Sequence, residues 1–452
     1  MQKHWFRLKR AANASLVILL AAVSSCSRTA PYGLDSRVVT KPYLQMPSEA
    51  GGKLPPLLSQ TGAFSDTAKR IPSKGLIPYE LNVAFWSDGA DKSRWIALPK
   101  GTIAFSATGE WRFPPGTIFV KNFDLPTDAA NPGMTRRLET RLLVCDSSGG
   151  VYGVVYKWRA DGSDADLLPG SQTEDIAVKS ANGESHVQTW YYPSRQDCLA
   201  CHNSTAGGVL GVKTRQMNRT FPYPSGITDN QLRTWNHLGL FDPAFKDEEL
   251  RSFAALAPAG DASRTLEDRA RSYLDANCAQ CHRPGETVAN FDARYDTPLA
   301  DQALIDGPVL IDQGIEHPRV ISPHDIWRSI AYMRMNTVAD IKMPPLARET
   351  IDYAGVRLLN DWINSMPGRP VLAPPVISPA GGTFAGPVEV SLISSEPGAD
   401  IRYTMDGSVP SASDLRYEKP IKLKGPAVLR ARVFKEGFTR SITEQQTFII
   451  GK

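Results

Sequence analysis

DCLACHN at residues 197–203 and NCAQCHR at residues 277–283 share one pattern: two cysteines separated by two residues, with a histidine directly after the second. The chain has six cysteines, and the pattern uses four of them: Cys198, Cys201, Cys278 and Cys281. A disulfide framework would spread its cysteines through a small domain, and this arrangement does not. The cysteine count therefore argues against a disulfide framework.

Covalent attachment of haem accounts for every part of this pattern. Two thiols on one helical turn reach the two vinyl groups on one edge of the ring, and the following histidine can bind the iron. A zinc site of four thiolates would leave both histidines unused, and a redox dithiol needs only one motif. We therefore predict two covalently bound c-type haems, attached at the four cysteines, with His202 and His282 as iron ligands.

The first residues have the form of an export signal. Four basic residues lie before the apolar run at residues 15–23, which is followed by SSC. The run is shorter than the ~20 residues that cross a bilayer. VSSC resembles the bacterial lipobox, which implies a signal peptide at residues 1–25, lipid on Cys26 and, because Ser27 is not aspartate, sorting to the outer membrane. A cleaved secretory signal with an incidental cysteine is the alternative.

Length and charge allow several domains and exclude some functions. A chain of 452 residues suggests about two to four domains. Its 51 basic and 47 acidic residues leave a net charge of +4, so we expect no nucleic-acid partner. Nucleotide-binding and hydrolase motifs are missing from the sequence, which makes hydrolytic chemistry improbable.

Residues 261–368 carry the second motif and three stretches with helical periodicity. Thr265 is a plausible N-cap for the first stretch, Ser322 for the second, and the third starts near residue 353. The Met343-Pro344-Pro345 sequence cannot lie inside a helix and predicts a fixed loop. The segment resembles an all-α class I cytochrome c domain, which implies His282 as proximal and Met343 as distal iron ligand. Two other methionines compete for the distal role: Met333 and Met335.

Residues 26–260, which carry the first motif, read as β-rich. Two β-branched and aromatic runs flank a turn at residues 146–150, which predicts a hairpin, and a further strand leads into Cys198. The segment weakly resembles the β-sheet haem proteins of the cytochrome c-prime-beta kind and their lysine-crosslinked relatives, in which Lys121 would match the crosslinking lysine. The distal ligand stays open between His237, Met217 and an iron without a sixth protein ligand.

The last part of the chain reads as a linker and a β-sandwich. Residues 369–380 are rich in proline and glycine, and short strands separated by turns follow at residues 381–452. IRYTMDGSVPS and the residues after it resemble the C-terminal domain of chitobiase and β-hexosaminidase, a small immunoglobulin-like module. That resemblance implies an accessory role with no catalytic residue.

Together these patterns predict a multidomain α+β fold: a β-rich haem domain, an all-α cytochrome c domain and a C-terminal immunoglobulin-like sandwich. The whole chain resembles a family of exported bacterial dihaem proteins found alongside sugar-oxidising quinoprotein dehydrogenases. The resemblance implies electron transfer in the periplasm or at the outer membrane, with a redox protein such as a quinoprotein dehydrogenase as partner. The alternative is a dihaem enzyme, a peroxidase or a nitrogen-oxide converter, with an open iron at the first haem.

Overall fold

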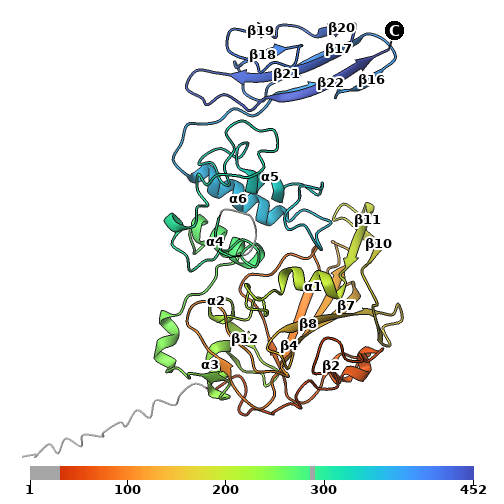
Figure 1. The fold of residues 1–452 in the computed structure, drawn as a ribbon, viewed down its shortest axis with the longest axis vertical. Helices are drawn as coiled ribbons and strands as arrows, with labels where there is room; N and C mark the ends of the chain where they lie inside the picture. The colour runs from red at the N-terminus through yellow and green to blue at the C-terminus, as the bar shows by residue number, and fades with distance from the viewer. Residues whose placement is uncertain (1–30, 286–290, 452) are drawn as a thin grey trace, which may run out of the picture. The chain divides into compact units, whose positions relative to one another are not determined.

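A six-stranded antiparallel sheet forms the centre of the first half of the chain (Figure 1). The computed structural model describes residues 31–285 and 291–451. The strands follow the order β3-β4-β6-β7-β8-β9. Their bounds are β3 (Leu76–Tyr79), β4 (Asp91–Ala97), β6 (Ile118–Pro126), β7 (Thr135–Cys145), β8 (Val151–Trp158) and β9 (Ala165–Leu167).

Both faces of this sheet are covered by other parts of the chain. Successive side chains of a strand point to opposite faces, and apolar residues occupy positions on both. Ile118 and Val120 of β6 pack into a core on one face together with Leu142 of β7. Phe119, which lies between them, packs into a second core on the other face with Trp235. The same alternation places Lys121 on the face of Phe119.

The hairpin expected around residues 146–150 is present, and the strand expected before Cys198 belongs to a second hairpin. Cys145 pairs with Val151, and the carboxylate of Asp146 holds the turn between them by accepting the amides of Ser148 and Gly150, each at 2.9 Å. A second hairpin, β10 (Gln172–Lys179) and β11 (Ser185–Tyr192), leads directly into α1 (Arg195–Cys201). The predicted hairpin and the predicted strand before Cys198 are therefore confirmed.

Short elements complete the first half of the chain around this sheet. They are η1 (Leu58–Thr61), β1 (Phe64–Asp66), β2 (Ile71–Pro72), β5 (Ile103–Ala104), α2 (Thr214–Met217), β12 (Thr220–Pro222), β13 (Thr228–Asn230), α3 (Gln231–His237), β14 (Phe241–Asp242) and η2 (Asp247–Ser252).

Residues 261–368 do not form the all-α domain that the sequence predicted. The helical elements here are α4 (Leu266–Asn277), η3 (Leu299–Asp301), α5 (Ile330–Met335) and α6 (Tyr353–Ser365). Most of the remaining residues are irregular, and β-bridges join some of them, as between Ile305 and Ile321. The described chain as a whole holds more strand than helix. The predicted fold class, with its all-α class I cytochrome c domain, is therefore wrong.

One helix is shorter than expected, and the cause is a local turn. The sequence pattern predicts a helix from Ser322, but α5 begins only at Ile330. His324 has a φ of +58°, which no right-handed helix accommodates. The carboxylate of Asp325 accepts the amide of Arg328 at 3.1 Å, so the backbone bonds to a side chain where the helix would have started. The other two expected helices are present as α4 and α6.

The tail forms two sheets around one core. One has the strand order β15-β17-β20 and the other β16-β22-β21-β18-β19. Val390, Leu429 and Phe448 lie fully buried in this core. The predicted C-terminal β domain is confirmed, and β15 starts inside the expected linker. The strands are β15 (Val376–Ser378), β16 (Gly382–Phe384), β17 (Val388–Ile393), β18 (Asp400–Thr404), β19 (Leu415–Arg416), β20 (Ile421–Leu423), β21 (Ala427–Phe434) and β22 (Glu444–Ile450).

Candidate functional site

The first Cys-x-x-Cys-His motif lies on α1, which is fixed at its start by a capping box. The Ser194 hydroxyl accepts the amide of Asp197 at 3.2 Å, and the Asp197 carboxylate accepts the amide of Ser194 at 2.8 Å. The helical turn that follows carries both Cys198 and Cys201. Gly153 of β8 lets this turn approach the sheet, because a Cβ there would lie 2.8 Å from Cβ and Sγ of Cys198.

The imidazole of His202 is held in one orientation. Its Nδ1 lies 2.8 Å from the carbonyl oxygen of Gly208, which assigns the ring proton to Nδ1. Burial lowers the pKa of His202 to about 4, so the ring is neutral at pH 7 and Nε2 keeps its lone pair. A neutral imidazole anchored through its second nitrogen is the arrangement that proteins use to bind a metal.

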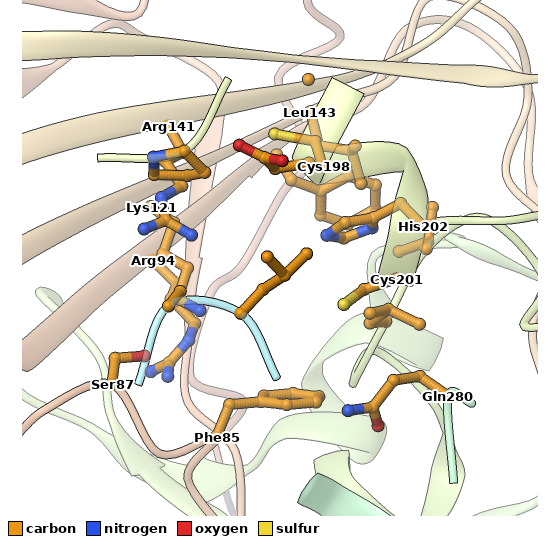
Figure 2. A pocket seen from close by; sticks show the side chains of 18 of the residues that line it. Phe85, Ser87, Arg94, Lys121, Arg141, Leu143, Cys198, Cys201, His202 and Gln280 are labelled. Carbon is orange, nitrogen blue, oxygen red and sulfur yellow. The ribbon is translucent and has the colours of Figure 1, made fainter. Parts of the chain in front are cut away.

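A cavity of about 210 Å³ opens beside His202 (Figure 2). The cysteines and histidine of the first motif lie on one side of it, and three cationic side chains from the sheet, Arg94, Lys121 and Arg141, lie on the other. Apolar side chains, among them Phe85 and Leu143, fill much of the remaining wall. The cavity is therefore mainly apolar, with an imidazole on one wall and cationic side chains on the opposite wall.

The structure does not bring Met217 or His237 to this cavity. Met217 is fully buried in the core beside Trp235. His237 is exposed at the end of α3, where its ring stacks on Tyr32 with 3.7 Å between centroids. Among the described residues, His202 is the one histidine that lines the cavity, and no methionine lines it.

The second motif follows the end of α4 directly. The amide of Cys278 donates to the carbonyl of Leu274, and the amide of His282 donates to that of Cys278, both at 2.8 Å. The imidazole of His282 stacks on Phe291 with 4.3 Å between ring centroids. Burial lowers its pKa to about 4. Its Nδ1 is buried and finds no hydrogen-bond partner in the part of the chain that the structure describes.

Met343 and His282 line the same cavity, which has a volume of about 290 Å³. Both cysteines of the second motif also line it, together with mainly apolar side chains. The structure thus brings together the two iron ligands that the sequence predicted for the second haem. Met335 lines the cavity as well, whereas Met333 does not.

Arg348 fixes the backbone that carries these methionines. Its side chain is 3% exposed and donates to the carbonyl of Met335 at 2.7 Å. It also donates to the carbonyls of Thr337 and Met343. A single guanidinium therefore joins the end of α5 to the Met343 loop, because its fork of donors can reach several carbonyls at once.

The two motifs contact one another. The thiols of Cys201 and Cys281 are hydrogen-bonded to each other. Arg283, which directly follows His282, donates to the carbonyl of Thr205 at 3.2 Å. Two motifs far apart in the sequence therefore form one continuous site.

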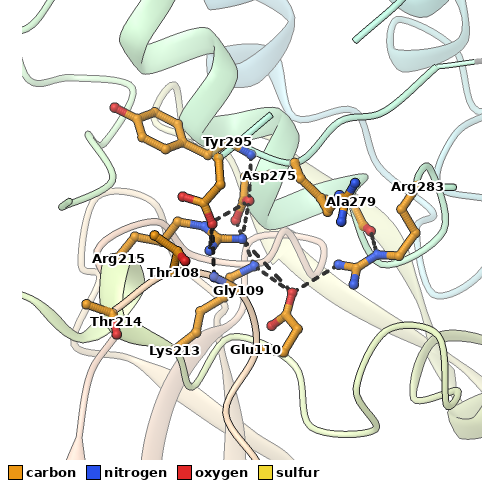
Figure 3. Close-up of polar contacts among 12 residues, drawn as sticks. Thr108, Gly109, Glu110, Lys213, Thr214, Arg215, Asp275, Ala279, Arg283 and Tyr295 are labelled. Carbon is orange, nitrogen blue, oxygen red and sulfur yellow. Dashed lines mark hydrogen bonds and ion pairs between the residues drawn. The ribbon is translucent and has the colours of Figure 1, made fainter. Parts of the chain in front are cut away.

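A buried ionic network fixes this junction (Figure 3). The carboxylate of Asp275 on α4 lies 3.0 Å from Nζ of Lys213 and 2.8 Å from Nη2 of Arg215. Glu110 accepts from Arg283 at 3.1 Å in the same network. Burial raises the pKa of Asp275, but its attraction to Lys213 and Arg215 outweighs burial and holds the pKa well below its usual range.

Sequence reasoning missed the cationic wall of Arg94 and Arg141, the clamp formed by Arg348 and the network around Asp275. The alternation of side chains along a strand could have placed Arg94 and Arg141 on one face of the sheet. That prediction would have required the pairing register of β4, β6 and β7, which the sequence does not provide. Neither Arg348 nor Asp275 lies in a motif, so nothing in the sequence distinguishes them from ordinary surface charges.

The described residues are compatible with covalent haem at both motifs. None of the five described cysteines forms a disulfide, so no disulfide blocks thioether bonds at the two motifs. Within the described ranges, no group of three or more His, Cys, Asp or Glu side chains is arranged to hold a metal ion. The export signal and Cys26 lie outside the described residues. No helix in the described part of the chain is long and apolar enough to cross a membrane.

Comparison with known families gives one match, to the chitobiase/beta-hexosaminidase C-terminal domain over residues 379–445. This agrees with the two-sheet core of the tail. No curated protein and no solved structure gives a significant match to the chain.

Proposed function

We propose that this chain is a dihaem c-type cytochrome that transfers electrons. The observation that supports this best is that each motif presents two thiols outside any disulfide and a half-buried, neutral imidazole to a mostly apolar cavity. Bound haem supplies a one-electron iron couple, and the protein sets its potential through the iron ligands and the surrounding groups.

The residues of each motif have defined roles in this proposal. Cys198 and Cys201 hold the first haem, and Cys278 and Cys281 hold the second. His202 and His282 are the proximal ligands. Met343 is the distal ligand of the second iron, and its soft thioether sulfur favours the ferrous state and raises the reduction potential.

The contact between the motifs supports electron exchange inside the chain. Thioether attachment at the neighbouring sulfurs of Cys201 and Cys281 would bring one edge of each haem together. The buried ions around Asp275 hold this junction in place, so the distance between the haems would vary little.

The setting of the function follows from the N-terminal sequence and from the family resemblance. We propose that the protein is exported, carries lipid on Cys26 and stays at the periplasmic side of the outer membrane. Its partner there is a periplasmic redox protein, and a quinoprotein dehydrogenase that delivers electrons is the leading candidate.

A redox enzyme is the second candidate, and one observation favours it. Apart from His202, no histidine or methionine of the described chain lines the first cavity. An iron without a strong sixth ligand can bind small molecules, as peroxidases and nitrogen-oxide converters require.

Haem content and ligand binding test both candidates. The full chain, produced with the export and haem-attachment machinery, should carry two covalent haems, and the Cys198→Ser/Cys201→Ser variant one. Absence of covalent haem would overturn both candidates. Carbon monoxide binding to the reduced protein, together with peroxide or hydroxylamine turnover, would favour the enzyme. Two low-spin irons that do not bind carbon monoxide would favour the electron-transfer protein.

A further inference from the structure

Three cations stand in one line across the central sheet. Arg94 of β4 is the cross-strand partner of Lys121 of β6, and Lys121 is the partner of Arg141 of β7. Directly paired residues share one face of a sheet, and like charges in such positions destabilise it. All three side chains reach the cavity beside His202 (Figure 2).

Nearby carboxylates form ion pairs only with Arg94 and Arg141, the two residues at the ends of this row. Arg94 is bonded to Glu80, and Arg141 to Glu139 at 2.6 Å. Lys121, in the middle, has no hydrogen-bond or ion-pair partner among the described residues, and its Nζ lies over the rings of Phe123 at 4.8 Å and Phe85 at 5.6 Å.

Further donors of the row are also without acceptors in the described chain. Nη2 of Arg94 and Nε of Arg141 are buried without a hydrogen-bond partner, and the side chain of Arg94 is only 3% exposed. A buried donor left unbonded destabilises the protein, so these positions point to an acceptor that completes them. Burial, together with Arg94, Lys92 and Arg141, lowers the pKa of Lys121 well below its usual value.

We propose that Arg94, Lys121 and Arg141 form an anion-binding site for a carboxylate or a small oxyanion in the first cavity. Guanidinium groups bind planar oxyanions through paired hydrogen bonds, and an anion between them removes the repulsion along the row.

Two sources can supply this chemistry. One is the propionate groups of the first haem: propionates leave the ring away from the vinyl edge, and the row faces the cysteines across the cavity. This source rests on the proposed function. The other is a free oxyanion that enters the cavity. This second source depends only on the charges of Arg94, Lys121 and Arg141.

The test compares Lys121→Gln with two other variants. Lys121→Arg keeps the charge, and Lys179→Gln removes a lysine from the exposed part of β10. Haem content is measured first, so that loss of the haem, which concerns the proposed function, is separated from loss of the anion site.

If propionates occupy the row, Lys121→Gln should keep both haems and lower the potential of one of them. Removal of a positive charge beside a carboxylate favours ferric iron. Lys121→Arg should restore the potential, and added phosphate should leave the wild-type spectrum unchanged.

If a free oxyanion is the ligand, phosphate, which is a poor ligand of haem iron, should shift the spectrum of the wild-type protein in a saturable way. Lys121→Gln should then bind it about tenfold to a hundredfold more weakly, as expected for one charged hydrogen bond. Calorimetry of the haem-loaded protein with phosphate gives the same comparison. If Lys121→Gln matches the wild type and Lys179→Gln in potential and in anion binding, the row is no anion site.

Discussion

The thiol of Cys201 is hydrogen-bonded to the thiol of Cys281, although the two cysteines belong to different motifs and are attached to different elements. The contact is supported by the hydrogen bond from the Arg283 guanidinium to the carbonyl of Thr205 and by the ionic network beside it. The junction of the two halves therefore lies at the candidate redox site itself.

This contact predicts a specific crosslink in the chain without haem. Cytoplasmic expression without attachment machinery leaves all thiols free, and mild oxidation should then join Cys201 to Cys281. Mass spectrometry of the unreduced peptides would identify the pair, and Cys145→Ser should not change it. Crosslinks found only inside each motif would contradict the contact.

Replacement of Met343 should change one haem only. Met343→Ala removes a soft sulfur ligand, so the reduction potential of one haem should fall while the other stays constant. A spectroelectrochemical titration measures both. Met335→Ala is the matched control, because Met335 lines the same cavity. If the control shows the fall and Met343→Ala does not, the distal ligand is Met335.

Gly153→Ala should interfere with the first motif and leave the second intact. The added Cβ would lie 2.8 Å from Cys198, so α1 must move away from the sheet. We expect incomplete haem attachment at Cys198 and a loss of about 1–3 kcal/mol in unfolding free energy. Peptide mass mapping and denaturant unfolding measure these effects. Gly170→Ala, where a Cβ meets nothing within 4 Å, should behave like the wild type.

The Asp275 network predicts a dependence of stability on pH. The pKa of Asp275 is depressed in the folded chain, so its ion pairs stabilise the protein above the unfolded value of about 4. That contribution is lost as the pH falls below this value and the carboxylate is protonated. Asp275→Asn should lower the unfolding free energy by about 3–5 kcal/mol at pH 7.

Denaturant unfolding of the wild type and Asp275→Asn, repeated down to acid pH, measures this contribution. The difference between the two proteins should shrink as the solution becomes more acid. Asp301→Asn, at an exposed position in η3, should show no such trend. A constant difference at all pH values would show that Asp275 acts through packing alone.

Local patterns in the sequence were sufficient for local structure. The turn at Asp146, the cap at Thr265 and the strands of the tail all depend on residues close in sequence, and each is present. The segment from Ser322 shows the limit of such patterns. Its apolar spacing favours a helix, but the Asp325 carboxylate and the backbone of His324 stabilise a turn instead.

Relations between distant segments could not be predicted in this way. The row of Arg94, Lys121 and Arg141 exists only because three strands pair in one register. The contact between Cys201 and Cys281 needs the packing of two segments that share no local signal. Such long-range placements decide the character of the candidate site.

The two imidazoles of the site differ in how their second nitrogen is placed. Nδ1 of His202 donates to a carbonyl oxygen, whereas Nδ1 of His282 has no such acceptor in the described chain. A donated hydrogen bond makes an imidazole more basic, and a more basic ligand favours ferric iron. If both motifs hold haem, the thioether of Met343 acts in the opposite sense on the second iron, so these two ligand effects favour the first haem as the stronger reductant. The positive charges of Arg94, Lys121 and Arg141 beside the first cavity act against that order. The direction of electron flow inside the molecule would then be set by the balance between the iron ligands and the charges beside the first cavity.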